Sequence, residues 1–185
     1  MIPDPRAPYE IREIRSGNLD SHRAMDINDA GWIAGDGTTR GKEAEPVFWR
    51  ANLDTIDRVS DHIGRAYAIG DSGILVGYGY TPDRSEHAMS WIGSDEPIDL
   101  GVFQGRDSHA RAISDNGSIA GLVGIDSNDR GQSKQRACVW IDGKLQVLTE
   151  TLECVWTNAI DLNSRGERYH SGSFKADFVG RQRDS

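Results

Sequence analysis

The chain has 185 residues, of which 37% are hydrophobic, 27% are charged and 21 are glycine, and its formal net charge at pH 7 is −8. This length fits one ordinary domain or one repeat array, and no apolar run approaches the roughly 20 residues that a membrane-spanning helix needs. An acidic chain lacks the basic face that attracts duplex nucleic acid or an anionic membrane, so we expect neither as a partner.

The chain begins with Met1-Ile-Pro-Asp-Pro-Arg, which has no apolar segment typical of a signal peptide. We therefore expect a cytoplasmic protein, or an exported one whose signal peptide has been removed. Residues 9–14 (Tyr-Glu-Ile-Arg-Glu-Ile) come next, and they are predicted to form a strand that precedes the first repeat.

From residue 24 onward one motif recurs, in which Ala-x-x-Ile is followed by a polar turn ending in glycine, a short apolar segment and a second glycine. The three clear copies are Ala24-Met-Asp-Ile-Asn-Asp-Ala-Gly-Trp-Ile-Ala-Gly35, Ala66-Tyr-Ala-Ile-Gly-Asp-Ser-Gly-Ile-Leu-Val-Gly77 and Ala110-Arg-Ala-Ile-Ser-Asp-Asn-Gly-Ser-Ile-Ala-Gly121. A degraded fourth copy begins at Thr157, and its Ile160 is aligned with Ile27, Ile69 and Ile113. Self-similarity at a fixed period of this length predicts a repeat architecture.

Two further motifs share the period. The first is Pro46-Val-Phe-Trp49, Ala88-Met-Ser-Trp91 and Ala137-Cys-Val-Trp140, and the second is Leu53-Asp-Thr-Ile56, Pro97-Ile-Asp-Leu-Gly101 and Leu145-Gln-Val-Leu148. In the third copy these motifs predict strands at 110–113, 118–121, 137–141 and 145–148, with turns at Asp115-Asn-Gly117 and Asp142-Gly143. Four strands in roughly 43 residues make the blade of a β-propeller.

We therefore predict an all-β single domain, a small propeller of about four four-stranded blades. The repeats span about 20–60, 61–104, 105–150 and a degenerate 151–180, with a frayed tail at 181–185. The last copy offers three candidate strands, at 158–162, 167–174 and 177–181, and residues 9–14 could supply its fourth strand and close the ring. The alternative is an open array, or a partial ring completed by a second chain as a homodimer.

The best-preserved stretch runs Asp99-Leu-Gly-Val-Phe-Gln-Gly-Arg-Asp-Ser-His-Ala-Arg-Ala-Ile-Ser-Asp-Asn-Gly-Ser-Ile-Ala-Gly121, followed by the shorter His87-Ala-Met-Ser-Trp91. These segments resemble the HAF repeat, a bacterial repeat described as a probable extracellular repeat. The resemblance covers about residues 20 to 150. It implies a repeated β fold and carries no catalytic residues to transfer.

Several short motifs receive a structural interpretation. Gly70-Asp-Ser-Gly73 resembles a serine nucleophile, but it aligns with the repeated turn and is predicted to be one. Residues 126–131 are predicted to be a solvated loop rather than a calcium site, because Arg130 stands where a ligand is needed. Cys138 lies in an apolar run and is predicted to be a buried free thiol, and with Cys154 it makes no disulfide framework.

The aromatic and histidine residues supply the candidate sites. The in-phase Trp49, Trp91 and Trp140 are predicted to fill the space between blades. Trp32 and Trp156 break the phase and are the candidates for an exposed binding contact.

Three histidines, His22, His62 and His109, lie just before the first strand of each repeat, so they are candidate binding residues at one end of the axis. They could hold a divalent transition metal together with Glu153 or Cys154, although the sequence does not call for a metal or any other cofactor.

The functional prediction is a non-enzymatic binding module. Every strong motif is explained by blade construction, so the loops at 36–45, 79–87 and 122–136 and an acidic surface are expected to bind a protein partner. The alternative is an enzyme, a hydrolase or lyase that could depend on a metal, with its site at the axial end of the propeller.

Overall fold

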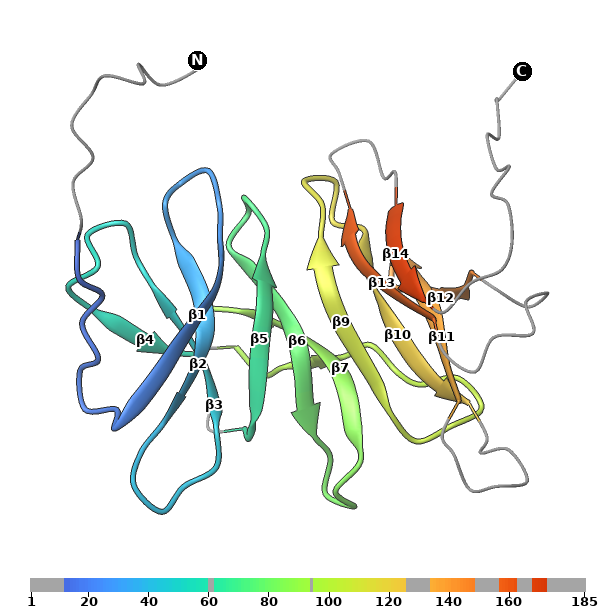
Figure 1. Cartoon of the computed structure of the whole chain (residues 1–185), viewed down its shortest axis with the longest axis horizontal. Coiled ribbons are helices and arrows are strands. Elements are labelled where there is room, and N and C mark those ends of the chain that lie inside the picture. The colour runs from blue at the N-terminus through green and yellow to red at the C-terminus, as the bar shows by residue number, and fades with distance from the viewer. Residues whose placement is uncertain are drawn as a thin grey trace.

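The computed structural model describes residues 12–59, 62–93, 95–125, 134–148, 157–162 and 168–172, and its regular elements are all β-strands. They form three four-stranded antiparallel sheets and one two-stranded antiparallel sheet, each made of consecutive strands. The sheets follow one another in chain order, from β1–β4 at one side of the molecule to β13–β14 at the other (Figure 1). The described residues are therefore all-β, as predicted, and none of these sheets closes on itself.

The strand bounds follow the repeats. The first sheet contains β1 (Ser21–Ile27), β2 (Ile33–Thr38), β3 (Glu45–Trp49) and β4 (Ile56–Arg58). The second contains β5 (Gly64–Ile69), β6 (Ile74–Tyr80), β7 (Glu86–Ile92) and β8 (Ile98–Asp99). The third contains β9 (Ser108–Ile113), β10 (Ile119–Ile125), β11 (Lys134–Ile141) and β12 (Lys144–Val147), and the fourth contains β13 (Thr157–Leu162) and β14 (Arg168–Gly172).

The turn chemistry of the repeat is confirmed. Asp142 and Gly143 have φ angles of 51° and 71°, the positive values that a type I′ hairpin turn needs. Gly73 also has a positive φ of 82°, and its N–H donates to the carbonyl of Gly70 at 2.9 Å, so Gly70-Asp-Ser-Gly73 is a turn, as expected.

A β-bulge interrupts the first strand of every sheet. Pairing with the second strand skips one residue in each case, and the skipped residues are Met25, Tyr67, Arg111 and Ile160. The bulge brings a carbonyl of the first strand close to a glycine of the second strand. A Cβ at Gly77 would lie 1.8 Å from the carbonyl oxygen of Arg65, and one at Gly121 would lie 1.9 Å from that of His109. Only glycine fits these positions, which is why this glycine recurs in the three clear copies.

The bulge corrects the alignment of the fourth copy. Pairing skips Ile160, so Leu162 rather than Ile160 occupies the place of Ile27. Asp26 and Asp161, the residues after the two bulges, each accept a hydrogen bond from the next backbone N–H at 2.8 Å. In this register the sequence Ala-Ile-Asp-Leu-Asn-Ser-Arg-Gly matches Ala-Met-Asp-Ile-Asn-Asp-Ala-Gly of the first copy.

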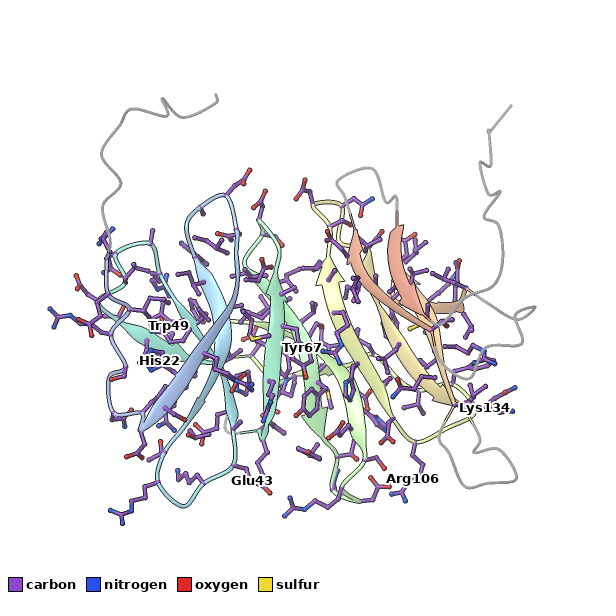
Figure 2. The ribbon with its side chains drawn as sticks, in the orientation of Figure 1. His22, Glu43, Trp49, Tyr67, Arg106 and Lys134 are labelled. Atoms are coloured by element: carbon purple, nitrogen blue, oxygen red, sulfur yellow. The ribbon has the colours of Figure 1, made fainter. Side chains whose placement is uncertain are left out.

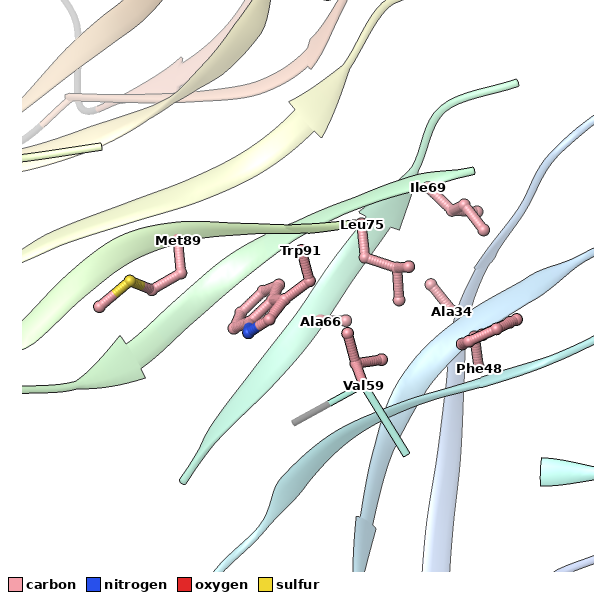
Figure 3. Close-up of a cluster of buried hydrophobic side chains, with 8 residues drawn as sticks. All are labelled: Ala34, Phe48, Val59, Ala66, Ile69, Leu75, Met89 and Trp91. Carbon is pink, nitrogen blue, oxygen red and sulfur yellow. The ribbon is translucent and has the colours of Figure 1, made fainter. Parts of the chain in front are cut away.

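The tryptophan of each third strand fills the space between sheets. Trp91 is fully buried in a cluster with Ala34, Phe48 and Val59 of the preceding sheet (Figure 3). Trp140 is buried in the same way against Ala68, Val76 and Ala88 of the second sheet. These contacts confirm the predicted role, and burying each indole contributes on the order of 2–3 kcal/mol.

The first sheet is covered by the segment that precedes it. Trp49 is fully buried, with Leu19 and Ile14 packed in its cluster, and its indole N–H donates to the carbonyl of Arg15 at 2.9 Å. The prediction that residues 9–14 complete the last sheet is therefore wrong for residues 12–14, which form no strand and lie against the first sheet. The physical reason is that Trp49 has no preceding sheet, so this segment shields it from water.

Several predictions concern residues outside those the structure describes. These are residues 9–11, the loop at 126–131, Glu153, Cys154, Trp156 and the strand at 177–181. Cys138 is a fully buried free thiol, as predicted, and burial raises its pKa. Within the described ranges no helix is long and apolar enough to cross a membrane.

Candidate binding site

The four bulges open onto one hollow. The first strands lie in sequence, with β1 next to β5, β5 next to β9 and β9 next to β13. Together they line a hollow of about 210 Å³, to which the skipped residues Met25, Tyr67, Arg111 and Ile160 all contribute. We call it the bulge hollow. Bulges re-aim side chains and often occur beside functional sites, and here they aim four side chains from four sheets at one space.

The bulge positions differ among the repeats, whereas their neighbours are alike. Each skipped residue follows an alanine, and three of the four second strands carry glycine opposite that alanine. The skipped residues themselves are a thioether, a phenol, a guanidinium and an aliphatic group. Because the four repeats carry different residues at this position, the sheets do not require a particular side chain there. These four side chains are therefore available for recognition.

Arg111 is the cation of the bulge hollow. Its guanidinium carbon lies 4.2 Å from the centroid of the Tyr67 ring, which is a cation–π contact. Its Nη2 lies 3.4 Å from Nδ1 of His109, and its Nε is buried with no hydrogen-bond partner among the described residues. Among the described residues no carboxylate lies within ion-pair distance of Arg111. Its charge is therefore neutralised by no neighbour in this part of the chain.

His109 contacts Arg111 and is itself held by its neighbours. The imidazole stacks on Tyr78 with ring centroids 4.6 Å apart, and its Nε2 lies 2.6 Å from a carboxylate oxygen of Glu86. The other oxygen of Glu86 accepts a hydrogen bond from the Tyr80 hydroxyl at 2.7 Å. Burial lowers the pKa of His109, against the opposing effect of Glu86. A neutral imidazole that donates from Nε2 to Glu86 presents Nδ1 as an acceptor, which suits the Arg111 N–H that faces it.

Two aspartates lie at equivalent places in the hollow, with different surroundings. Both oxygens of Asp26 are occupied, since Oδ1 accepts from the N–H of Ile27 at 2.8 Å and Oδ2 accepts from the N–H of Ile69 at 2.9 Å. Asp26 thereby joins the first sheet to the second. Asp161 has the first of these hydrogen bonds, from the N–H of Leu162 at 2.8 Å, without a counterpart of the second in the described residues.

Acidic turns lie at the end of the molecule next to the hollow. Asp29, Asp71 and Asp115 occupy the same position of the turn that follows β1, β5 and β9, and all three are exposed. Figure 2 shows side chains at the tips of these turns along one edge of the molecule. Exposed acids of the connections between third and fourth strands belong to the same end: Asp54, Asp95, Glu96 and Asp142. The acidic surface expected from composition is therefore concentrated, in the described residues, where the turns repeat.

The three predicted histidines have different neighbours. His22 lies against Trp49, with ring centroids 5.6 Å apart (Figure 2), and His62 lines a groove beside Pro82 and Tyr80. None of the three lines the bulge hollow, although His109 contacts Arg111, which does. Within the ranges that the structure describes, no three His, Cys, Asp or Glu side chains are grouped so as to hold a metal ion.

Trp32 is a half-buried packing residue at the rim between the first two sheets. Its ring stacks on Phe48 with centroids 5.9 Å apart, and the guanidinium carbon of Arg50 lies 5.3 Å from its ring centroid. A Cβ placed at Gly73 would lie 3.0 Å from the same ring. Trp32 therefore spans from its own sheet to the turn of the next.

A second groove lies at the opposite end, between the first two sheets. Its volume is about 270 Å³, and Lys42, Arg65 and Tyr78 are among its lining residues. The predicted loop 36–45 supplies Thr38, Lys42, Glu43 and Ala44 of its lining, and the predicted loop 79–87 supplies Tyr80. The third predicted loop, 122–136, is outside the described residues between 126 and 133.

The bulge residues are absent from the sequence-based candidates. The sequence does contain an indication of them, because Met25, Tyr67 and Arg111 are different residues at the same position of otherwise matching copies. Ile160 could not be added to this set from the sequence, because the fourth copy was aligned two residues out of register.

Comparisons of this chain with protein-family models, with curated proteins and with solved structures find no match.

Proposed function

We propose that the protein is a non-enzymatic binding module, a small β-propeller of about four HAF-type repeats that binds a protein partner at its acidic turn end. The observation that carries the proposal is the set of exposed aspartates at the same turn position of the three clear repeats, Asp29, Asp71 and Asp115. Three four-stranded meanders whose first strands share one hollow support the propeller.

The charge of this end defines the partner. Asp29, Asp71 and Asp115 are exposed, and complementary charge on a basic partner raises the association rate and excludes acidic competitors. At the opposite end two exposed acids are paired with arginines, Glu43 with Arg84 and Asp83 with Arg106, each at 3.0 Å. A basic protein therefore approaches by the turns.

The alternative function, a hydrolase or lyase with its site at the axial end, requires the three histidines to lie together at that end. None of them lines the hollow; His109 contacts Arg111 of its wall, and its Nε2 is engaged by Glu86. The charged groups inside the hollow are one guanidinium and two carboxylates, of which Asp26 has both oxygens committed to backbone N–H groups. This arrangement favours recognition over proton transfer.

Affinity capture with mass spectrometry tests the proposal on the full chain. The test variant carries Asp29→Asn, Asp71→Asn and Asp115→Asn, which keep the turn geometry and remove three charges. The matched control carries Glu43→Gln, Asp83→Asn and Asp107→Asn at the opposite end. We expect one partner to be recovered by the wild type and the control, and its Kd for the turn variant to rise about tenfold at low salt.

Equal affinity of the turn variant and the control would overturn the assignment of the turn end. An enzymatic turnover that is lost in the Asp26→Asn or Asp161→Asn variant would overturn the non-enzymatic assignment.

A further inference from the structure

We propose that the bulge hollow is a binding site for a small zwitterion, a molecule that carries a carboxylate and an ammonium group a few ångström apart, of which α-amino acids are the simplest class. The site is separate from the protein-binding surface of the turns. Its volume of about 210 Å³ is below the roughly 300–1,000 Å³ of pockets that take drug-sized ligands. The ligand is therefore small.

Arg111 is the carboxylate-binding group. Arg111 lines the hollow, and among the described residues no carboxylate lies within ion-pair distance of its guanidinium. A carboxylate matches the planar fork of a guanidinium with two parallel hydrogen bonds. The Tyr67 ring and Nδ1 of His109 already hold the guanidinium on the wall of the hollow. The side chain therefore loses little conformational freedom when the anion binds.

Asp161 is the ammonium-binding group. In the equivalent place, Asp26 uses its second oxygen to accept the N–H of Ile69 on the next sheet. The corresponding donor for Asp161 would be the N–H of Ile27, and this N–H already donates to Asp26 at 2.8 Å. Among the described residues the second oxygen of Asp161 thus has no backbone donor of this kind, and Asp161 lines the same hollow as Arg111 of the neighbouring strand. A guanidinium and a carboxylate that can each form further hydrogen bonds fit a ligand that carries a carboxylate and an ammonium group.

Apolar groups complete the lining. Met25 and Ile160 are 44% and 50% exposed, and both border the hollow. Covering them with an apolar side chain of the ligand removes this surface from water. We therefore expect amino acids with apolar side chains to bind more tightly than acidic or basic ones.

Isothermal titration of the full chain with a panel of α-amino acids tests the proposal. We expect at least one with an apolar side chain to bind, and its N-acetyl derivative and its amide, each of which lacks one charge, to bind at least tenfold more weakly. Because these analogues are compared on the wild-type protein, this part of the test does not depend on any variant folding.

Two variants assign the groups. Arg111→Gln and Asp161→Asn are each expected to raise the Kd at least tenfold, because each removes a charge-assisted hydrogen bond. Arg65→Gln, in the second groove, and Asp115→Asn, at a turn, are the matched controls and are expected to leave the Kd unchanged.

Three outcomes would overturn the proposal: no binding of any amino acid at millimolar concentration, equal binding of the N-acetyl or amide analogue, or binding that Arg111→Gln and Asp161→Asn leave unchanged. None of these results bears on the protein partner, whose capture depends on the turn aspartates.

Discussion

The three core tryptophans differ in one respect that stability measurements can detect. The indole N–H of Trp140 donates to the carbonyl of Leu100 at 2.7 Å, whereas the indole N–H of Trp91 is buried and has no partner in the part of the chain that the structure describes. The two rings are otherwise matched, since Trp91 and Trp140 are 0% and 1% exposed and occupy the same position of their sheets. Replacing each by phenylalanine should therefore have unequal effects.

The difference in free energy of unfolding follows from the hydrogen bonds. Both substitutions remove similar volume from a packed site, so the cavity cost is similar and largely cancels in the comparison. Trp140→Phe also removes a hydrogen bond worth about 1 kcal/mol, whereas Trp91→Phe removes a buried donor whose desolvation costs about 1–3 kcal/mol. Trp140→Phe is expected to be more destabilising than Trp91→Phe by about 2 kcal/mol or more.

Urea unfolding followed by far-ultraviolet circular dichroism measures this difference as a shift of the midpoint at constant m. Trp49→Phe serves as a second reference, because its indole donates to the carbonyl of Arg15 at 2.9 Å, and it should resemble Trp140→Phe. A Trp91→Phe variant that is as unstable as Trp140→Phe would refute the reasoning.

Two further predictions concern a glycine and a histidine. Gly121→Ala should lower the free energy of unfolding by about 3 kcal/mol or more, since its Cβ would lie 1.9 Å from the His109 carbonyl oxygen. Gly143→Ala has open space around its Cβ and should lower it by only about 1–2 kcal/mol, because of its φ of 71°. Equal losses of the two variants in urea unfolding would contradict this prediction. Because the pKa of His109 is lowered on folding, the unfolded chain binds more protons just below the ordinary value of 6.5, so stability should fall as pH drops below that value. The contribution of this one group to the slope of unfolding free energy against pH is at most about 1.4 kcal/mol per pH unit. Stability curves of wild type and His109→Gln that run parallel between pH 7.5 and 5 would contradict the assignment.

The repeating parts of the fold could be predicted because their causes are local. A type I′ turn needs two residues that tolerate positive φ, and Asp142-Gly143 supplies them without reference to the rest of the chain. The tryptophan of each third strand could be assigned to the core from its fixed phase, because a large apolar side chain repeated at one position has to be buried in each copy. Trp49, Trp91 and Trp140 confirm this assignment.

The errors arose where distant segments compete for one place. Residues 12–14 lie against the first sheet instead of extending the last one, since Trp49 needs cover that no preceding sheet supplies. The fourth copy was aligned on Ile160 because Ala-Ile resembles the other copies, but the bulge puts Leu162 in the buried position, at 8% exposure against 50% for Ile160. Neither outcome can be read from local propensity, which is the same in both arrangements.

By itself, the sequence determined the all-β class, the strands of three sheets, their turns and the core tryptophans, since each depends on alternation or backbone angles within a few residues. Only the tertiary structure decided that Met25, Tyr67, Arg111 and Ile160 line one hollow. These residues are more than forty positions apart in the chain, and their meeting requires both the bulge in each first strand and the packing of one sheet on the next. Packing between sheets is a long-range property, so the binding site emerges only when the repeats are assembled.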